Sequence, residues 1–445
     1  MRKYPSVGVA AGGVLIPRPG TDHAKWAVVA CDQYTSEPKY WSEVADAVGD
    51  APSTLNLIYP EVYLGERDPH IRIAAIRRAM QEYLDQEVLV EEDHLIYVER
   101  EVAGRTRRGL VLAVDLEQYD YNKGSSSLIR ATEGTILDRL PPRVRIRQGA
   151  PVELPHIMVL IDDSDGTVIE PVAARRAELE RLYDFDLMMD SGHLTGFAVR
   201  SMAMEEQVMG ALAALAEPAG FCRRYGFSEH RPVLLYAMGD GNHSLATAKA
   251  IWERTKLAVG DPTVVMSSPA RYALVELVNV HDEALVFEPI HRVLFGLAAG
   301  RDPAVEMVRH YEGRCSVHGV ASLAEVRERV DGPGDGVHRI GVVRPDGFSV
   351  LELRDPTSNL PVGSLQAFLD GFLADGAASS IDYVHGTSTV LNLGREPGNI
   401  GYYLPAMDKH ELFKSVIVDG ALPRKTFSMG EAYEKRFYLE ARRLG

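Results

Sequence analysis

A stretch of glycine and polar residues lies between two apolar segments near the middle of the chain. The apolar run 233–238 ends in Gly239-Asp240-Gly241, and Asn242-His243-Ser244 then opens a segment, 242–256, with the pattern of a helix. Glycine permits a positive φ and a close approach of ligand to backbone. A helix N-terminus presents free N–H groups and a positive dipole end to anions. The stretch therefore predicts a phosphate site that includes Gly241, Asn242 and Ser244.

Two side chains of this motif are candidates for catalysis. Asp240 is a carboxylate suited to hold Mg²⁺ or to orient a hydroxyl, and His243 is suited to act as an acid, a base or a phosphate ligand. In the alternative interpretation Asp240-Gly241 is only a tight turn, and Asn242 or Ser244 only caps the helix. The unbroken polar stretch between two strongly apolar runs favours the functional interpretation.

A second candidate segment is rich in arginine, although the chain as a whole is acidic. Five arginines fall within eighteen residues: Arg130, Arg139, Arg143, Arg145 and Arg147. The planar guanidinium group suits phosphate and carboxylate oxygens, Thr132 adds a hydroxyl donor, and Glu133 is a candidate general base. The segment predicts phosphate binding by Arg130, Thr132, Arg139 and Arg143. The alternative is a solvated basic face paired with the surplus acids.

Three weaker features complete the candidates. Asp32 follows the apolar segment 24–30, which is predicted to be a strand, and site residues often emerge where a strand ends. Lys425 could close a phosphate pocket from near the C-terminus, and the acids of 182–186 with His193 could hold a metal. Each has a structural alternative, namely a turn, an exposed basic residue or the end of a helix.

Several common chemistries lack their motifs. The sequence has no G-x-x-x-x-G-K-[ST] and no G-x-G-x-x-G after a strand, so the standard nucleotide-binding loops are excluded. It also has no G-x-S-x-G elbow and no H-E-x-x-H pair, which excludes the usual serine hydrolases and zinc peptidases.

The composition limits the class of protein. The formal net charge of −15 argues against nucleic acid as a partner, because affinity for its backbone is largely electrostatic. Three cysteines far apart in sequence predict neither a disulfide framework nor a zinc ribbon. The glycine-rich N-terminal segment, stopped by Pro17 and Pro19, is interpreted as an opening strand rather than a signal peptide. The few, scattered cysteines fit a reduced setting, so the chain is expected to be cytoplasmic. No apolar run approaches the length of a membrane span.

Alternating patterns of strand and helix predict a mixed α/β fold. Apolar runs at 157–162 and 232–238 predict buried strands, and charged segments at 70–86 and 172–182 predict helices. A hairpin is expected over 338–353 in a smaller C-terminal α/β unit. The expected organisation is an N-terminal α/β segment 1–120, a central segment 121–300 with both motifs, and a C-terminal segment 301–445. The alternative is one domain over 1–300.

Four motifs give the sequence a family resemblance. They are WAVVACDQY at 26–34, RATEGTILDRLPPRVRIR at 130–147, LPHIMVLID at 154–162 and GDGNHSLATAK at 239–249. Together they resemble the bacterial family of unknown function DUF1015, over nearly the whole chain. The Asp-Gly-x-His element is also similar to that of free-serine kinases of the ParB/sulfiredoxin-like superfamily, which implies a core of that fold.

The second resemblance implies specific roles. Asp240, Gly241 and His243 match the phosphate-binding turn, and Ser244 stands where those kinases have an arginine, so that Arg130 or Arg139 would have to supply the charge. A separate upstream acid activates the serine hydroxyl in those kinases. Glu133, and after it Asp32, are the candidates for that acid here.

The leading hypothesis from the sequence is a kinase for a small hydroxyl-bearing metabolite, with L-serine as the first choice of acceptor. The phosphate donor would be a nucleotide or pyrophosphate with Mg²⁺ bound at Asp240, because phosphoryl transfer chiefly needs positioning and charge neutralisation. One alternative is a ligand- or nucleic-acid-binding regulator of the same superfamily. Another is a hydrolase or lyase acting on an anionic metabolite. Assembly into a homo-oligomer is left open.

Overall fold

The chain forms two compact units in the computed structural model, which describes residues 1–135 and 140–445. The first unit is Met1–Leu285 together with Gly430–Gly445, and the second is Val286–Met429. The expected segment 1–120 lies wholly in the first unit, whereas 121–300 and 301–445 each contribute residues to both. The last sixteen residues therefore belong to the first unit, although the rest of that unit lies far from them in the sequence.

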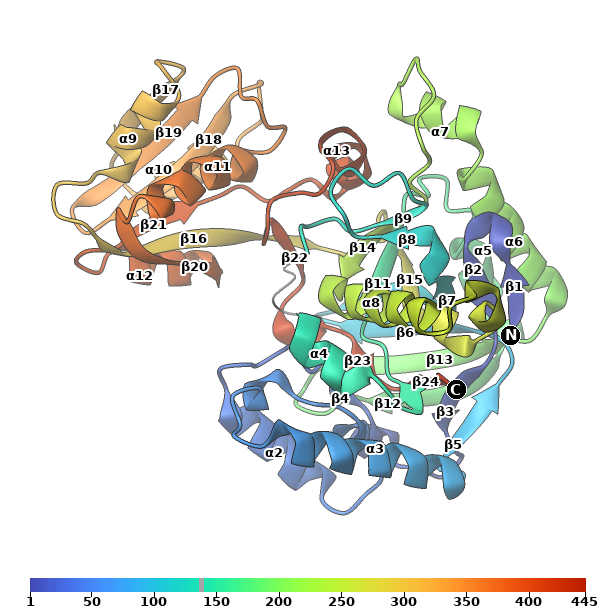
Figure 1. The fold of residues 1–445 in the computed structure, drawn as a ribbon. Helices are drawn as coiled ribbons and strands as arrows, with labels where there is room; N and C mark the ends of the chain where they lie inside the picture. Colours follow the sequence, from blue (N-terminus) through green and yellow to red (C-terminus); the bar gives the residue numbers. More distant parts are fainter. Residues whose placement is uncertain (136–139) are drawn as a thin grey trace. The chain divides into compact units, whose positions relative to one another are not determined.

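The first unit is built on a mixed sheet of eleven strands (Figure 1). Its main path runs β12 (Glu180–Asp186), β13 (His193–Val199), β6 (Leu95–Val102), β7 (Arg105–Asp115), β15 (Tyr272–Asn279), β11 (Met158–Ile161), β14 (Tyr236–Asp240), β9 (Ile129–Arg130) and β8 (Tyr119–Asp120). Strand β2 (Val9–Ala11) pairs with β7 and with β1 (Arg2–Tyr4). Strand β14 is antiparallel to β11 and parallel to β9, so the segment after β9 lies beside the C-terminal end of β14.

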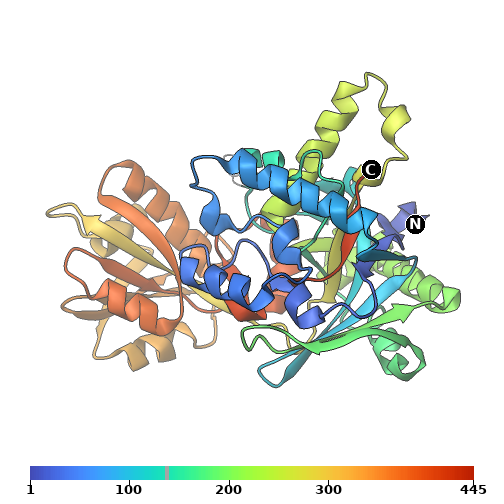
Figure 2. The same cartoon turned by 90° about the horizontal axis from the view of Figure 1, so that it is seen from below.

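Helices cover both faces of this sheet, and the alternation of side chains along its strands explains why (Figure 1, Figure 2). Tyr97 and Val275 pack with α6 (Met202–Leu215) and α8 (Asn242–Ala258) on one face. Ile96 and Leu274, their neighbours along the strands, pack with α2 (Pro38–Val48) and α3 (Pro69–Asp85) on the other. Strands buried on both faces read as continuous apolar runs, as the sequence does at 157–162 and 232–238.

The C-terminal residues complete two small sheets of the first unit. Strand β24 (Ala441–Arg443) lies between β10 (Val152–Glu153) and β3 (Val14–Pro17), which also pairs with β5 (Leu89–Glu92). Strand β23 (Phe437–Tyr438) pairs with β4 (Val28–Val29), with Tyr438 opposite Val28. This pairing places the C-terminal segment beside the residues that lead to Asp32.

The second unit is a smaller α/β body with a seven-stranded sheet. Its strands are β17 (Cys315–Val320), β19 (Gly347–Leu353), β18 (His338–Arg344), β21 (Ile400–Tyr403), β16 (Phe287–Leu297), β20 (Ala378–His385) and β22 (Phe427–Met429). Its helices are α9 (Pro303–His310), α10 (Leu323–Val330), α11 (Pro361–Ala374), α12 (Thr387–Gly394) and α13 (Leu412–Asp419). The expected hairpin over 338–353 is β18–β19. The predicted fold class, mixed sheets flanked by helices with a smaller C-terminal α/β unit, is confirmed.

Two predicted elements are wrong. The segment 24–30 contains the short helix α1 (His23–Trp26) before β4, because Asp22 accepts hydrogen bonds from the amides of Ala24 and Lys25 and so starts a helix. The predicted helix 172–182 is only α5 (Glu170–Ala174), after which β12 begins at Glu180. Pairing of β12 with β13 overrides the local helical pattern there. None of the helices within 1–135 and 140–445 has both the length and the apolar character of a membrane span.

Candidate active site

Helix α8 begins directly after β14, within the glycine-rich motif. Gly241 has a φ of +79°, and a Cβ atom at this position would lie 3.0 Å from the Cα of Ile157. Both facts require glycine here. Among the described residues no side chain caps this helix, whereas Ser201 caps α6. The first turn of α8 therefore directs an uncapped positive end towards the end of β14.

A buried lysine lies beside this helix end. The Nζ atom of Lys435 is 3.1 Å from Oδ2 of Asp240, while Oδ1 of Asp240 accepts a hydrogen bond of 2.8 Å from the Gly241 amide. The side chain of Lys435 is only 9% exposed. A buried ammonium group needs a negative partner, and Asp240 supplies it. Lys435 and Asp240 thus form a buried ion pair beside the positive end of α8.

A group of four polar residues adjoins the first turn of α8. The imidazole of His156 lies at its centre, with Nε2 at 3.2 Å from Oγ of Ser244 and 3.7 Å from Oδ2 of Asp32. Its Nδ1 atom is 2.7 Å from the hydroxyl of Tyr438. Burial alone would raise the pKa of the Asp32 carboxyl, but His156, Gln33 and Lys435 together hold that pKa below its usual value. Asp32 is therefore an anion at neutral pH.

Tyr438 links His156 to the C-terminal segment. Burial raises the pKa of Tyr438 well above its usual value, so the phenol keeps its proton. The Cys31 amide donates to the Tyr438 oxygen at 3.2 Å, and the same oxygen lies 2.7 Å from Nδ1 of His156. The tautomer of the imidazole decides which of these two atoms donates. Nε2, on the other side of the ring, faces Ser244 and Asp32.

An ion pair and a cavity lie next to this group. Arg143 of α4 (Leu140–Arg147) is paired with Glu61, and burial raises the pKa of the Glu61 carboxyl despite this partner. Both residues line a cavity of about 130 Å³, which His156, Ser244 and Tyr438 also line. The polar group at α8 therefore borders a solvent-open cavity of the size of a small ligand.

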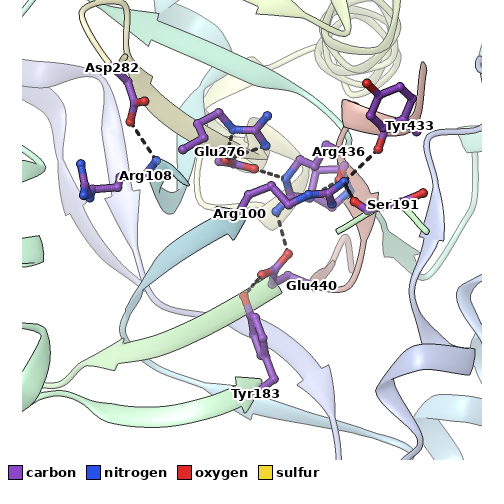
Figure 3. Close-up of polar contacts among 11 residues, drawn as sticks. Arg100, Arg108, Tyr183, Ser191, Glu276, Asp282, Tyr433, Arg436 and Glu440 are labelled. Atoms are coloured by element: carbon purple, nitrogen blue, oxygen red, sulfur yellow. Dashed lines mark hydrogen bonds and ion pairs between the residues drawn. The ribbon is translucent and has the colours of Figure 1, made fainter. Parts of the chain in front are cut away.

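Buried ion pairs fix the segment that carries Lys435 and Tyr438 (Figure 3). Arg436 lies 2.8 Å from Glu276 and 2.6 Å from Glu440, and it also donates to the carbonyl oxygen of Pro155, the residue before His156. Glu440 in turn accepts a hydrogen bond from Tyr183. Burial would raise the pKa of Glu276, but the neighbouring arginines hold it low. Arg436 therefore positions site residues on both sides of itself.

The sequence matches the model of a known family over most of its length. The family is described as "Protein of unknown function (DUF1015)", and residues 15–372 match it. This chain belongs to the DUF1015 family. No curated protein sequence matches it.

Several solved structures resemble this DUF1015 protein at low similarity. A free serine kinase in complex with AMP has a TM-score of 0.39 and 10% identity, covering 75% of this chain and 92% of the kinase chain. SbnI with a C-terminal truncation, from Staphylococcus aureus, has a TM-score of 0.35 and 11% identity, covering 72% and 82%. A conserved hypothetical protein from Pyrococcus furiosus has a TM-score of 0.34 and 10% identity, covering 74% and 90%. Activity resides in sites rather than in folds, so it has to be argued from the side chains.

Some of the residues predicted from the sequence lie together in this DUF1015 protein. The end of β14 and the first turn of α8 hold Asp240, Gly241, Asn242, His243 and Ser244, and the adjoining groups include Asp32 and Arg143. Thr132 donates to the carbonyl oxygen of Met238 at 2.7 Å, so Glu133, the next residue, follows at the same edge of the sheet.

Other predicted residues are placed differently. The guanidinium group of Arg130 donates to the backbone carbonyls of Ser127, Pro232 and Val233, which gives it a structural role in tying β9 to the segment before β14. Lys425 belongs to the second unit. Arg139 lies outside the described residues.

Four site residues of this DUF1015 protein were missed in the sequence. They are Glu61, His156, Lys435 and Tyr438. His156 lies within LPHIMVLID, one of the four motifs of the resemblance, and a histidine just before a buried strand was a usable signal. The sequence around Lys435 and Tyr438 gave no such signal, because only the return of the C-terminal segment to the first unit brings these residues close to α8.

The acids near His193 form ion pairs rather than a metal site. His193 lies 2.7 Å from Asp186 and 2.6 Å from Asp184 across the β12–β13 hairpin. Among the described residues no group of three metal-binding side chains has the arrangement to hold an ion. The predicted metal carboxylates of 182–186 are therefore explained by this pairing.

The His193 pair makes part of the protein's stability depend on pH. Hydrogen bonds that the protonated His193 donates to Asp186 and Asp184 raise the pKa of His193, although burial opposes them. A raised folded-state pKa contributes stability below about pH 6.5, the unfolded value. That contribution is lost as the pH rises through the folded value. We expect the urea midpoint of the wild type to fall between pH 6 and pH 9, and that of His193→Gln to fall less. An equal change of the urea midpoint with pH in the two proteins would contradict this expectation.

Proposed function

We propose that this protein transfers a phosphoryl group from a nucleotide or pyrophosphate to the hydroxyl group of a small metabolite. The observation that carries the proposal is the convergence of three features on the end of β14. These are the uncapped N-terminus of α8, the buried Lys435 and the anionic carboxylate of Asp32. The first two supply positive potential for phosphate oxygens, and the third can receive a proton.

The phosphate side of the proposed reaction is the first turn of α8. Backbone amides at a helix N-terminus and a buried ammonium stabilise the charge of a transferring phosphoryl group. The side-chain oxygen of Asn242 is buried and has no hydrogen-bond partner among the described residues, and a hydroxyl or amine of a ligand would satisfy it. Arg143, on the neighbouring helix α4, is a further cation for the donor.

Magnesium fits this proposal at one position. Proteins commonly hold Mg²⁺ through one or two carboxylates together with the phosphates of the substrate, and Asp240 offers such a carboxylate beside the helix end. The ion would neutralise charge on the donor phosphates. Lys435 would orient the Asp240 carboxylate through their ion pair.

The acceptor side of the proposed reaction is Asp32. As the acceptor oxygen forms its bond to phosphorus, the bond between phosphorus and the leaving oxygen breaks, and the hydroxyl proton passes to the Asp32 carboxylate. Nε2 of His156 faces the same carboxylate at 3.7 Å. Glu133 is the second candidate for the base, since it lies at the same edge of the sheet.

Phosphorus NMR tests the proposal directly. The protein would be incubated with Mg²⁺ and ATP, ADP or pyrophosphate in separate tubes, each with and without L-serine as the first acceptor. We expect a phosphomonoester resonance that needs protein, donor and acceptor together. Release of inorganic phosphate at the same rate without any acceptor would replace the proposal by hydrolysis.

The contact between Ser244 and His156 suggests a second candidate, a hydrolase with Ser244 as nucleophile. Such a mechanism needs an unprotonated Nε2 facing the serine. In a kinase, by contrast, we expect Ser244→Ala to retain phosphoryl transfer within about tenfold, because the hydroxyl is at most one of several phosphate contacts. Complete loss of turnover, together with a covalent adduct on Ser244 in intact-protein mass spectrometry, would favour the hydrolase.

A further inference from the structure

The lining of the cavity beside the proposed site is mostly apolar, with a few polar groups. Its apolar wall includes Leu57, Ile58, Leu64, Met80, Ile146 and Leu154. None of these side chains has a hydrogen-bond donor, and only the thioether of Met80 is a weak acceptor. The polar edge of the lining holds the Glu61–Arg143 and Arg147–Glu153 ion pairs, His156 and Ser244. Ligand sites typically combine a mostly apolar lining with a few polar groups, and this cavity does so.

The polar edge of the cavity is also the acceptor side of the proposed reaction. His156 and Ser244 line the cavity and contact each other, and Nε2 of His156 also faces Asp32. A molecule with its apolar part against Met80 and Ile146 would therefore hold a terminal hydroxyl near His156 and Asp32. The hydroxyl would then lie where the proposed reaction needs the acceptor hydroxyl.

The volume of the cavity sets how much of this apolar part its walls can cover. An apolar cavity of about 150 Å³ in a protein core holds benzene, and this cavity measures about 130 Å³. It therefore has room for about five or six carbon atoms. The hydroxymethyl group of L-serine would leave most of the apolar wall uncovered.

We propose that the acceptor is a small alcohol or amino alcohol with an apolar group of about five or six carbon atoms, bound in this cavity with its hydroxyl at His156 and Asp32. This inference rests on the proposed function for its chemistry, in which the hydroxyl proton passes to Asp32 and the phosphoryl group comes from the nucleotide or pyrophosphate. The Glu61–Arg143 pair at the edge offers a carboxylate and a guanidinium to an amino or carboxyl group of the same molecule.

Binding of simple alcohols, without any phosphate donor, tests the cavity alone. The full chain would be titrated with primary alcohols from ethanol to 1-octanol, with benzyl alcohol and with L-serine, by ligand-observed NMR. We expect affinity to rise about fourfold for each added carbon up to five or six, and then to level off. An affinity that does not depend on chain length would overturn the inference.

Two methionine variants provide the matched comparison. Met80 lines the cavity and is buried, whereas Met202 is 46% exposed on α6. Met80→Ala enlarges the cavity by the space of three side-chain atoms (Cγ, Sδ and Cε) and should shift the preferred alcohol towards a chain longer by about three carbons. Met202→Ala should leave the series unchanged. If Met80→Ala does not fold, Leu64→Ala replaces it with the same expected direction. An identical series in the folded cavity variant and the Met202→Ala protein would overturn the inference.

Phosphorus NMR on the same samples separates this inference from the proposed function. Alcohols that bind with the expected chain-length dependence but are not phosphorylated with any donor would leave the cavity assignment standing and remove the proposed function. Phosphorylation of L-serine by a protein that binds none of the alcohols would support the proposed function and overturn the cavity assignment. Preferential phosphorylation of the five- and six-carbon alcohols would support both.

Discussion

Replacing Arg436 by methionine is expected to lower the free energy of unfolding by about 3–5 kcal/mol. Arg436, Glu276 and Glu440 are each no more than 5% exposed, and the arginine is paired with both carboxylates. Methionine keeps the bulk of the side chain but leaves these carboxylates buried with less positive charge around them. Arg107, at 3.3 Å from Glu276, compensates only one of them. The hydrogen bond to Pro155 is lost as well.

Urea unfolding of the wild type and the variant measures this effect. Arg175→Met is the matched control, because Arg175 pairs with Glu178 at the surface and its removal should leave the midpoint unchanged. The Arg436 variant should also lose activity under conditions where it is still folded, since residue 436 fixes Lys435, Tyr438 and the Pro155–His156 turn. Equal midpoints for wild type and Arg436→Met would show that the buried pairs do not stabilise the C-terminal segment.

Periodicity in the sequence predicted the central elements because their burial is local information. The runs 157–161 and 232–238 are apolar without interruption, which is typical of strands covered on both faces. The strand in the second run, β14, begins only at Tyr236 and continues to Asp240. The helix predicted over 172–182 was wrong because the pairing of β12 with β13 overrides the local helical preference of this segment. That pairing depends on residues elsewhere in the chain. The helix α1 forms at 23–26, where a strand was predicted, and its start depends on a single side chain, that of Asp22.

The candidate site was predicted in its local part only. The strand, glycine and helix of 233–256 follow one another in sequence, and the structure keeps them together. Asp32 was chosen because it follows a predicted strand, and Arg143 because of its residue type; the fold brings both beside that motif. The arginine-rich segment, by contrast, mixes roles that its composition could not separate, since Arg130 binds carbonyls while Arg143 binds a carboxylate. Lys435 and Tyr438 required knowledge of where the chain returns after the second unit.

Asp32→Asn is expected to lower the rate of phosphoryl transfer by about 10²–10⁴-fold, the usual effect of removing a general base. Asparagine keeps the size of the side chain and can still contact His156, but it cannot take the hydroxyl proton. Because the surroundings hold the pKa of Asp32 below its usual value, the carboxylate persists as the pH falls. We therefore expect the wild-type rate to show no loss from protonation of Asp32 between pH 8 and about pH 5.

The assignment of the base is decided by comparing three variants under the conditions that give a phosphomonoester. Asp50→Asn, at an exposed position on the surface, controls for the substitution itself and should match the wild type. Glu133→Gln tests the second candidate. A severe loss in the Glu133 variant with a nearly normal rate in Asp32→Asn would move the base to Glu133, and the cavity would then have to present its ligand towards β9. Loss in Asp32→Asn alone, with an unchanged unfolding midpoint, would identify the Asp32 carboxylate as the base. This carboxylate lies near His156 and Lys435, beside the N-terminal end of α8.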